Sequence, residues 1–290
     1  MISTNVDKLV KISVIGEVAN PSMPPLPASP YIISADGEPL LIPAYGGLVY
    51  NVKIGDRAVG WAAELIQAGV SIKNSDAGAH NALSVYACIG NPARIVSGQA
   101  SGAEGMVTGK SGRFADHVVC YFKQADLEKL SPGDKVQIKA FGVGLRFTDF
   151  PLVDIKSCDP GLLGKMQIII QQEKLVVPVK AMVPNTIVGA GSGFQSENKV
   201  INLQMTDPDI RREAKLDNLC FGDLVGVQDW DSRYTHGYLR GSVAVGVVSQ
   251  GASIRSGFGP GITVIMTGSA GQIQPEVVGE ANIAHYLCLL

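Results

Sequence analysis

A dense group of polar side chains directly follows an apolar run, residues 223–227, that is typical of a buried strand. If the chain stays extended there, Asp229 and Asp231 point to the same side, because side chains alternate along a strand. Neighbouring carboxylates can hold a hard cation or raise one another's pKa. Both are therefore candidate ligand contacts and the only candidates for a metal, and Asp231 and His236 are candidate acid–base residues.

Arg233 and Tyr234 belong to the same segment and offer further groups for a ligand. An arginine can hold a carboxylate or phosphate through two parallel hydrogen bonds, which makes Arg233 a candidate anchor for an anionic substrate group. The structural alternative is a surface pair of Asp231 and Arg233, with Trp230 and Tyr234 packed inward. Only the density of polar residue types favours function over this alternative.

A second polar group, residues 74–81, lies between a Gly-rich segment and an apolar run that predicts a strand over 83–89. We expect a loop here, and loops carry binding residues more often than cores do. His80 is a candidate acid–base residue, and Asp76 and Asn81 are candidate ligand contacts. No third metal ligand accompanies this Asp–His pair, and the alternative is a loop whose short polar side chains satisfy their own backbone.

Gly257 and Gly259 lie in a Gly-rich turn, residues 251–261, between two apolar strands. Without a Cβ, they would let a ligand approach the backbone closely, so both are candidate binding positions. The Gly-rich segments fit neither the spacing of a nucleotide P-loop nor that of a dinucleotide fingerprint. The cofactor, if any, is therefore left unassigned.

Residues 90–109 predict two strands joined by a Gly-rich turn, and this segment resembles the KOW motif, a hairpin of small SH3-like barrels that bind RNA or protein. The basic residues near it are Arg94, Lys110 and Arg113. Phosphate contacts normally supply most of the affinity for nucleic acid, and three cations are few. We therefore expect a hairpin that serves the geometry of a barrel.

Short apolar runs bounded by turn residues recur along the whole chain, and helix signals are few, the best being a helix that begins after Asp207. Strands without alternating helices favour barrels or sandwiches. We expect a mostly β protein of two barrel- or sandwich-like domains with few short helices. Turn formers near 145–160 divide it into an N-terminal domain, residues 1–148, and a C-terminal domain, residues 149–290. A Pro-rich stretch over 20–27 is expected to be extended.

The composition of the chain limits which kinds of partner we expect for it. Charged residues make up 17% of the chain against roughly 25% in an average domain, and residues 284–290 are largely apolar; both features predict a homo-oligomer. A net charge of −2 argues against nucleic acid as a partner. No apolar run is long enough to cross a membrane and no secretory signal opens the chain. Five widely spaced cysteines without a Cys-x-x-Cys motif predict free thiols in a reducing cytoplasm.

The chain resembles, over nearly its whole length, an uncharacterised bacterial and archaeal family known as domain of unknown function 4438. The resemblance rests on residues 46–56, 60–62 and 69–74, on the Gly-rich hairpin, and on 241–261. It implies an N-terminal and a C-terminal domain and no particular reaction. A looser similarity to formamidases and acetamidases rests on Asp229-Trp-Asp and Gly241-Ser-Val, and the His ligands expected there are absent.

Two functional hypotheses follow. In the first, the polar groups around His80 and Asp231 face one cleft between the domains, where they bind or transform a small polar metabolite. In the second, the protein is a non-catalytic binding or assembly protein that uses its KOW-like barrel.

Overall fold

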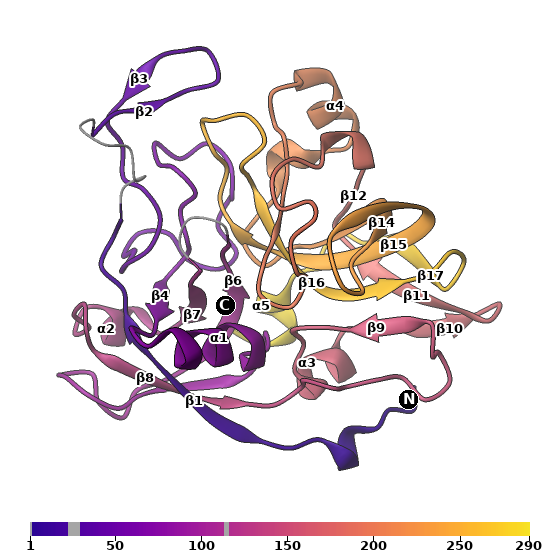
Figure 1. Cartoon of the computed structure of the whole chain (residues 1–290), viewed down its shortest axis with the longest axis horizontal. Helices are drawn as coiled ribbons and strands as arrows, with labels where there is room; N and C mark the ends of the chain where they lie inside the picture. The colour runs from indigo at the N-terminus through magenta and orange to yellow at the C-terminus, as the bar shows by residue number, and fades with distance from the viewer. Residues whose placement is uncertain (1, 23–29, 113–115) are drawn as a thin grey trace.

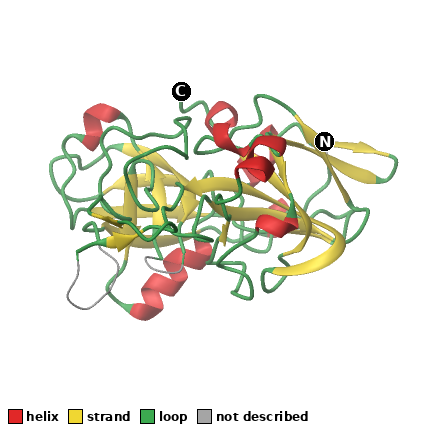
Figure 2. Ribbon diagram, turned by 90° about the horizontal axis from the view of Figure 1, so that it is seen from above, coloured by secondary structure: helices red, strands yellow, loops and turns green. Residues whose placement is uncertain are grey.

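The computed structural model describes residues 2–22, 30–112 and 116–290, so Arg113 and most of the Pro-rich stretch lie outside the described residues. The chain is mostly β, as expected, and its helices are short (Figure 1). Figure 2 shows the helices on the outside of the strands. No described helix is long and apolar enough to span a membrane.

The N-terminal part forms a closed six-stranded barrel in the order β1-β4-β7-β6-β5-β8. All neighbours in it pair antiparallel, and alternate side chains fill the interior. Closure removes the exposed strand edges that an open sheet would present. The strands are β1 (Ile12–Val18), β4 (Val70–Lys73), β5 (Pro92–Ile95), β6 (Glu104–Lys110), β7 (Val118–Tyr121) and β8 (Lys135–Ala140). A separate hairpin joins β2 (Ile32–Ile33) to β3 (Pro39–Leu40).

Strands β5 and β6 are the two strands predicted for the Gly-rich segment, and Gly98 and Gly102 between them have positive φ. Gly109, near the end of β6, lies against strand β15 of the second sheet. A Cβ built on Gly109 would lie 2.2 Å from the Cβ of Ser249, so only glycine permits this approach. The glycine thus brings the barrel into contact with the rest of the molecule.

The strand expected over residues 83–89 is wrong, because helix α1 (Ala77–Tyr86) occupies most of it. Asp76 caps this helix by accepting a hydrogen bond from the Ala79 backbone N–H, and Leu83 is buried against β1. The short polar residues read as a ligand loop are therefore a helix start, for which Asp is among the best caps.

The C-terminal part contains two sheets. The larger sheet runs in the order β12-β14-β15-β16-β13, and β9 also pairs with β16, along its last residues. The long strands β14, β15 and β16 form the centre of this larger sheet. The smaller sheet runs in the order β10-β11-β17. The strands are β9 (Val153–Ile155), β10 (Ile169–Gln171), β11 (Lys174–Val179), β12 (Ala181–Val183), β13 (Ile201–Asn202), β14 (Leu224–Asp231), β15 (Gly237–Gln250), β16 (Gly261–Gly268) and β17 (Ile273–Val277).

Asp207 caps helix α4 (Pro208–Glu213), and Pro208 takes its first position, as the sequence predicts. The remaining short helices are α2 (Gln124–Leu127), α3 (Pro160–Lys165) and α5 (Ile283–Tyr286), with 3-10 turns at Val6–Lys8, Asn185–Ile187 and Leu216–Asn218.

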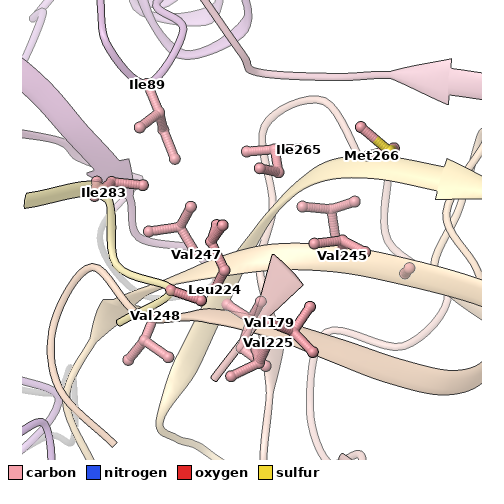
Figure 3. Close-up of a cluster of buried hydrophobic side chains, with 14 of the residues drawn as sticks. Ile89, Val179, Leu224, Val225, Val245, Val247, Val248, Ile265, Met266 and Ile283 are labelled. Carbon is pink, nitrogen blue, oxygen red and sulfur yellow. The ribbon is translucent and has the colours of Figure 1, made fainter. Parts of the chain in front are cut away.

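The larger hydrophobic core belongs to both halves of the chain. Ile89 from the N-terminal half belongs to the same cluster as Val247 of β15 and Ile283 of α5 (Figure 3). Only the first part of the apolar tail packs fully into its own chain: Ala284 is fully buried, whereas Leu290 lies beside Gly55 but is 69% exposed. The predicted homo-oligomer stays a prediction.

Candidate functional site

Asp229 and Asp231 do not act as one carboxylate pair. A β-bulge interrupts β14 between Gln228 and Trp230, and Asp229 adopts φ 52°. Its carboxylate accepts hydrogen bonds from the Gly241 backbone N–H at 2.6 Å and from Asn185 Nδ2 at 3.1 Å. The bulge breaks the strand alternation on which the shared side was predicted. Among the residues that the structure describes, no three His, Cys, Asp or Glu side chains gather as a metal site would require.

Asp231 instead pairs with Arg233, whose Nε lies 3.0 Å from Oδ1 and 3.2 Å from Oδ2. Both side chains are partly exposed, at 21% for Asp231 and 34% for Arg233. The side-chain hydrogen bond with Asp231 raises the pKa of Arg233 above its usual range. This is the surface pair of the structural alternative, and Trp230 is packed inward as that alternative expected, but Tyr234 is exposed. Arg233 and Tyr234 also line a cavity described below.

His236 is buried, with 1% of its surface exposed. Its Nδ1 lies 3.0 Å from Ser232 Oγ, and its backbone pairs with Phe194 and Gly193. Burial lowers its pKa to about 4, so the ring is neutral at pH 7. His236 does not line the cavity, and its observed contacts are structural.

His80 and Asp76 contact the start of their own helix. His80 Nδ1 accepts a hydrogen bond from the Asn74 backbone N–H at 3.2 Å, and Asp76 is the helix cap. Asn81 faces the C-terminal half, where Asn198 Nδ2 lies 3.4 Å from its Oδ1. Val85, one turn further along the helix, is the residue of α1 that lines the cavity.

Gly257 and Gly259 lie in a different region, where their turn meets residues 189–203. The Gly257 carbonyl accepts from the Ala190 N–H, and the Gly259 N–H donates to the Leu203 carbonyl. The same turn carries Arg255, which pairs with the fully buried Glu64 at 2.7 Å. These contacts give the glycines a role in close packing between chain segments.

A cavity of about 310 Å³ lies between the barrel and the second sheet; we call it the Ser157 cleft. Three cationic and two acidic side chains line it, together with the Ser157 hydroxyl. Lys156 Nζ and Glu197 Oε1 form an ion pair at 2.6 Å. The lining residues with polar side chains are Arg146, Asp154, Lys156, Ser157, Glu197, Arg233 and Tyr234.

Lys110 lies directly behind the cleft and is 1% exposed. Its Nζ is 2.8 Å from Ser157 Oγ, 2.8 Å from the Glu197 carbonyl oxygen and 3.5 Å from the Val85 carbonyl oxygen. Burial lowers its pKa to about 8. The sequence does not predict this site, because Lys110 follows the hairpin cation Arg94 and Ser157 lies among the turn formers of the domain boundary.

A second hollow, of about 540 Å³, lies on the outside of the barrel hairpin. Arg94, Lys123 and Lys139 line it with Tyr121, while Glu104 lies directly across from Arg94 on the neighbouring strand. These cations are on the surface, whereas Lys110 is buried and cannot reach a phosphate on this face.

Two family models cover most of the chain. Residues 31–164 match the N-terminal domain, and residues 165–287 the C-terminal domain, of the family described as Domain of unknown function (DUF4438). A solved structure described as "Crystal structure of TM1086" is 40% identical, with a TM-score of 0.92, over 98% of this chain and 99% of that one. No curated protein matches. The barrel, the second sheet and both matched segments together show that the chain belongs to the DUF4438 family.

Proposed function

We propose that this protein binds a small polar metabolite carrying a negatively charged group in the Ser157 cleft. The observation that carries the proposal is the set of charges around one half-open hollow, which is lined by three cations and two carboxylates. Sites of this kind commonly form where two structural units meet, because each side contributes its own groups.

Arg233 is the best candidate for the anchor. Asp231 contacts the guanidinium through Nε, which orients the group and leaves its two terminal nitrogens, Nη1 and Nη2, outside this contact. Arg146 and Lys156 reach the same space from the barrel side and from the segment after β9, respectively. Tyr234, 77% exposed, borders the space and offers an aromatic face to the ligand.

Titration calorimetry with acetate, succinate and inorganic phosphate tests the proposal. We expect at least one anion to bind, and Arg233→Gln to weaken that binding about tenfold or more, since a charged hydrogen bond contributes about 1.5–3 kcal/mol. Arg212→Gln is the matched control, because Arg212 forms a similar Asp–Arg pair, with Asp209, on the exposed surface of α4. Equal binding by both variants, or binding of none of the three anions, would contradict the proposal.

The assembly role of the barrel remains the second candidate function, and the hollow beside Arg94 and Tyr121 is the surface that favours it. We prefer the Ser157 cleft because its polar groups are partly buried and converge, whereas the hairpin cations are dispersed and Arg94 lies across from Glu104. We still expect no useful affinity for nucleic acid and a homo-oligomer in solution. Filter binding to RNA at physiological salt tests the first expectation, and light scattering tests the second.

A further inference from the structure

The amine of Lys110 has the surroundings of a neutral base. Full burial removes the water that would stabilise an ammonium ion, and this lowers its pKa to about 8. Its neighbours are two carbonyl oxygens and one hydroxyl. A neutral amine has two N–H groups and one lone pair, so it can donate to the Glu197 and Val85 carbonyls and accept the Ser157 proton.

Ser157 connects this amine to the cleft. Its Oγ is 2.8 Å from Lys110 Nζ and 3.4 Å from the Glu197 carbonyl oxygen, so the amine is the nearer partner. The residue adopts φ 43°, a left-handed conformation that is uncommon for serine. Hydrogen bonds from Ile89 N–H to the Ser157 carbonyl and from Lys156 N–H to the Ile265 carbonyl hold the backbone on both sides. Such strained, well-held residues cluster at functional sites.

We propose that Ser157 is a nucleophile activated by Lys110, and that the protein hydrolyses or transfers the acyl group of a small ester or amide. This proposal rests on the cleft of the proposed function and names its chemistry. A Ser–Lys pair is one of the known ways to activate a serine. The cations of the cleft would hold a negatively charged end of the substrate beside the serine.

The reaction balances with water as the second reactant. Ser157 Oγ forms a bond to the acyl carbon while its proton passes to Lys110 Nζ. The bond from that carbon to the leaving oxygen or nitrogen breaks with its electron pair, and the leaving group takes the proton from Lys110. Water then attacks the acyl carbon while the same amine takes its proton. The bond from that carbon to Ser157 Oγ breaks, Oγ takes the proton from Lys110, and the acid and the free serine are released.

The alternative is that Lys110 is only a structural cross-link between the barrel, α1 and the 195–199 segment. A structural lysine would give no chemical reactivity to Ser157, so reactivity separates the two roles. Phenylmethanesulfonyl fluoride is a suitable probe, because Ser157 Oγ would bond to its sulfur while fluoride leaves. Mass spectrometry of the digested full-length protein then locates the label.

We expect a label on Ser157 that forms faster as pH rises through about 8, the pKa of Lys110, and levels off about one pH unit higher, where the amine is mostly neutral. Cys88, Glu197 and Lys156 are the titratable groups facing Lys110, and burial raises the pKa of the Cys88 thiol to about 11, beyond this range. Lys110→Met should slow labelling about a hundredfold, the lower range of a general-base contribution. Lys199→Met is the control, since Lys199 pairs with Asp116 and does not line the cleft.

The proposal is overturned if the folded wild type carries no label on Ser157 between about pH 6 and 9. It is also overturned if the label forms at the same rate in Lys110→Met. If Lys110→Met does not fold, the wild-type profile decides: a rate that does not change through pH 8 excludes Lys110 as the base. Anion binding without any label would leave the proposed function standing and reject this chemistry. A label without anion binding would support the Ser157 chemistry and reject the proposed anion-binding function.

Discussion

Arg255 should hold the buried carboxylate of Glu64 in place, and replacing it should destabilise the fold. Glu64 is fully buried, and its Oε1 accepts from Arg255 Nη2 at 2.7 Å and Nε at 3.0 Å. Ser253 Oγ and the Ile254 N–H supply two further hydrogen bonds. Removing one partner of a buried pair costs about 3–5 kcal/mol. Because both neutral donors remain, we expect Arg255→Met to lose about 3 kcal/mol, the lower end of that range.

Urea denaturation followed by circular dichroism measures this loss. Adding Glu64→Gln to Arg255→Met should restore most of the stability, because the buried charge is then gone, and the double-mutant cycle isolates the pair. Arg212→Met breaks an exposed pair and should change the stability by less than about 0.5 kcal/mol. If Arg255→Met costs no more than Arg212→Met, the buried pair does not anchor the turn and the reasoning is wrong.

Three further predictions follow from burial. Burial lowers the pKa of His117 and of His236 to about 4, below the unfolded value of 6.5, so their stability contribution is complete above pH 6.5 and is lost as pH falls toward 4. Between about pH 7 and 4.5, each histidine should account for roughly 2 kcal/mol of that loss, measured by urea denaturation as the difference between wild type and each His→Gln variant. Gly109→Ala should lower the free energy of unfolding by about 1–3 kcal/mol through its clash with β15, while Gly164→Ala, open and helical, should raise it slightly; thermal unfolding distinguishes them. Exposed Cys288 should react with Ellman's reagent in the native protein and the three buried thiols only after unfolding, and rapid modification of all of them under native conditions would contradict the described burial.

The strands were predictable because period-2 patterns and turn residues determine them locally. The hairpin of β5 and β6 and the capped helix α4 follow from Gly and Asp–Pro signals that act within a few residues. Helix α1 was missed because its apolar residues, read without the Asp76 cap, resemble a strand. A short apolar run is ambiguous between the two structures until its cap is recognised.

The candidate site was predictable only in part. Arg233 and Tyr234 do line a cavity, but polar density also selected His80 and His236, whose observed contacts are with their own chain segments. The Lys110–Ser157 contact joins residues far apart in sequence, and neither has a local signature. A lysine in a strand is ordinarily assigned to the exposed face, so only tertiary packing reveals that this one is buried.

The contact of β6 with β15 limits how members of the family could exchange parts. Lys110 offers its backbone N–H to Thr263 Oγ1, and its carbonyl accepts from Ser249 Oγ beside the Gly109 approach. In a chimera that joined the N-terminal domain of one relative to the C-terminal domain of another, the two sides of this contact would come from different proteins. A bulkier residue at 109 would clash with Ser249, and loss of the Thr263 hydroxyl would leave the buried Lys110 N–H unpaired. These three positions should therefore be inherited together even though they lie on opposite sides of the domain boundary.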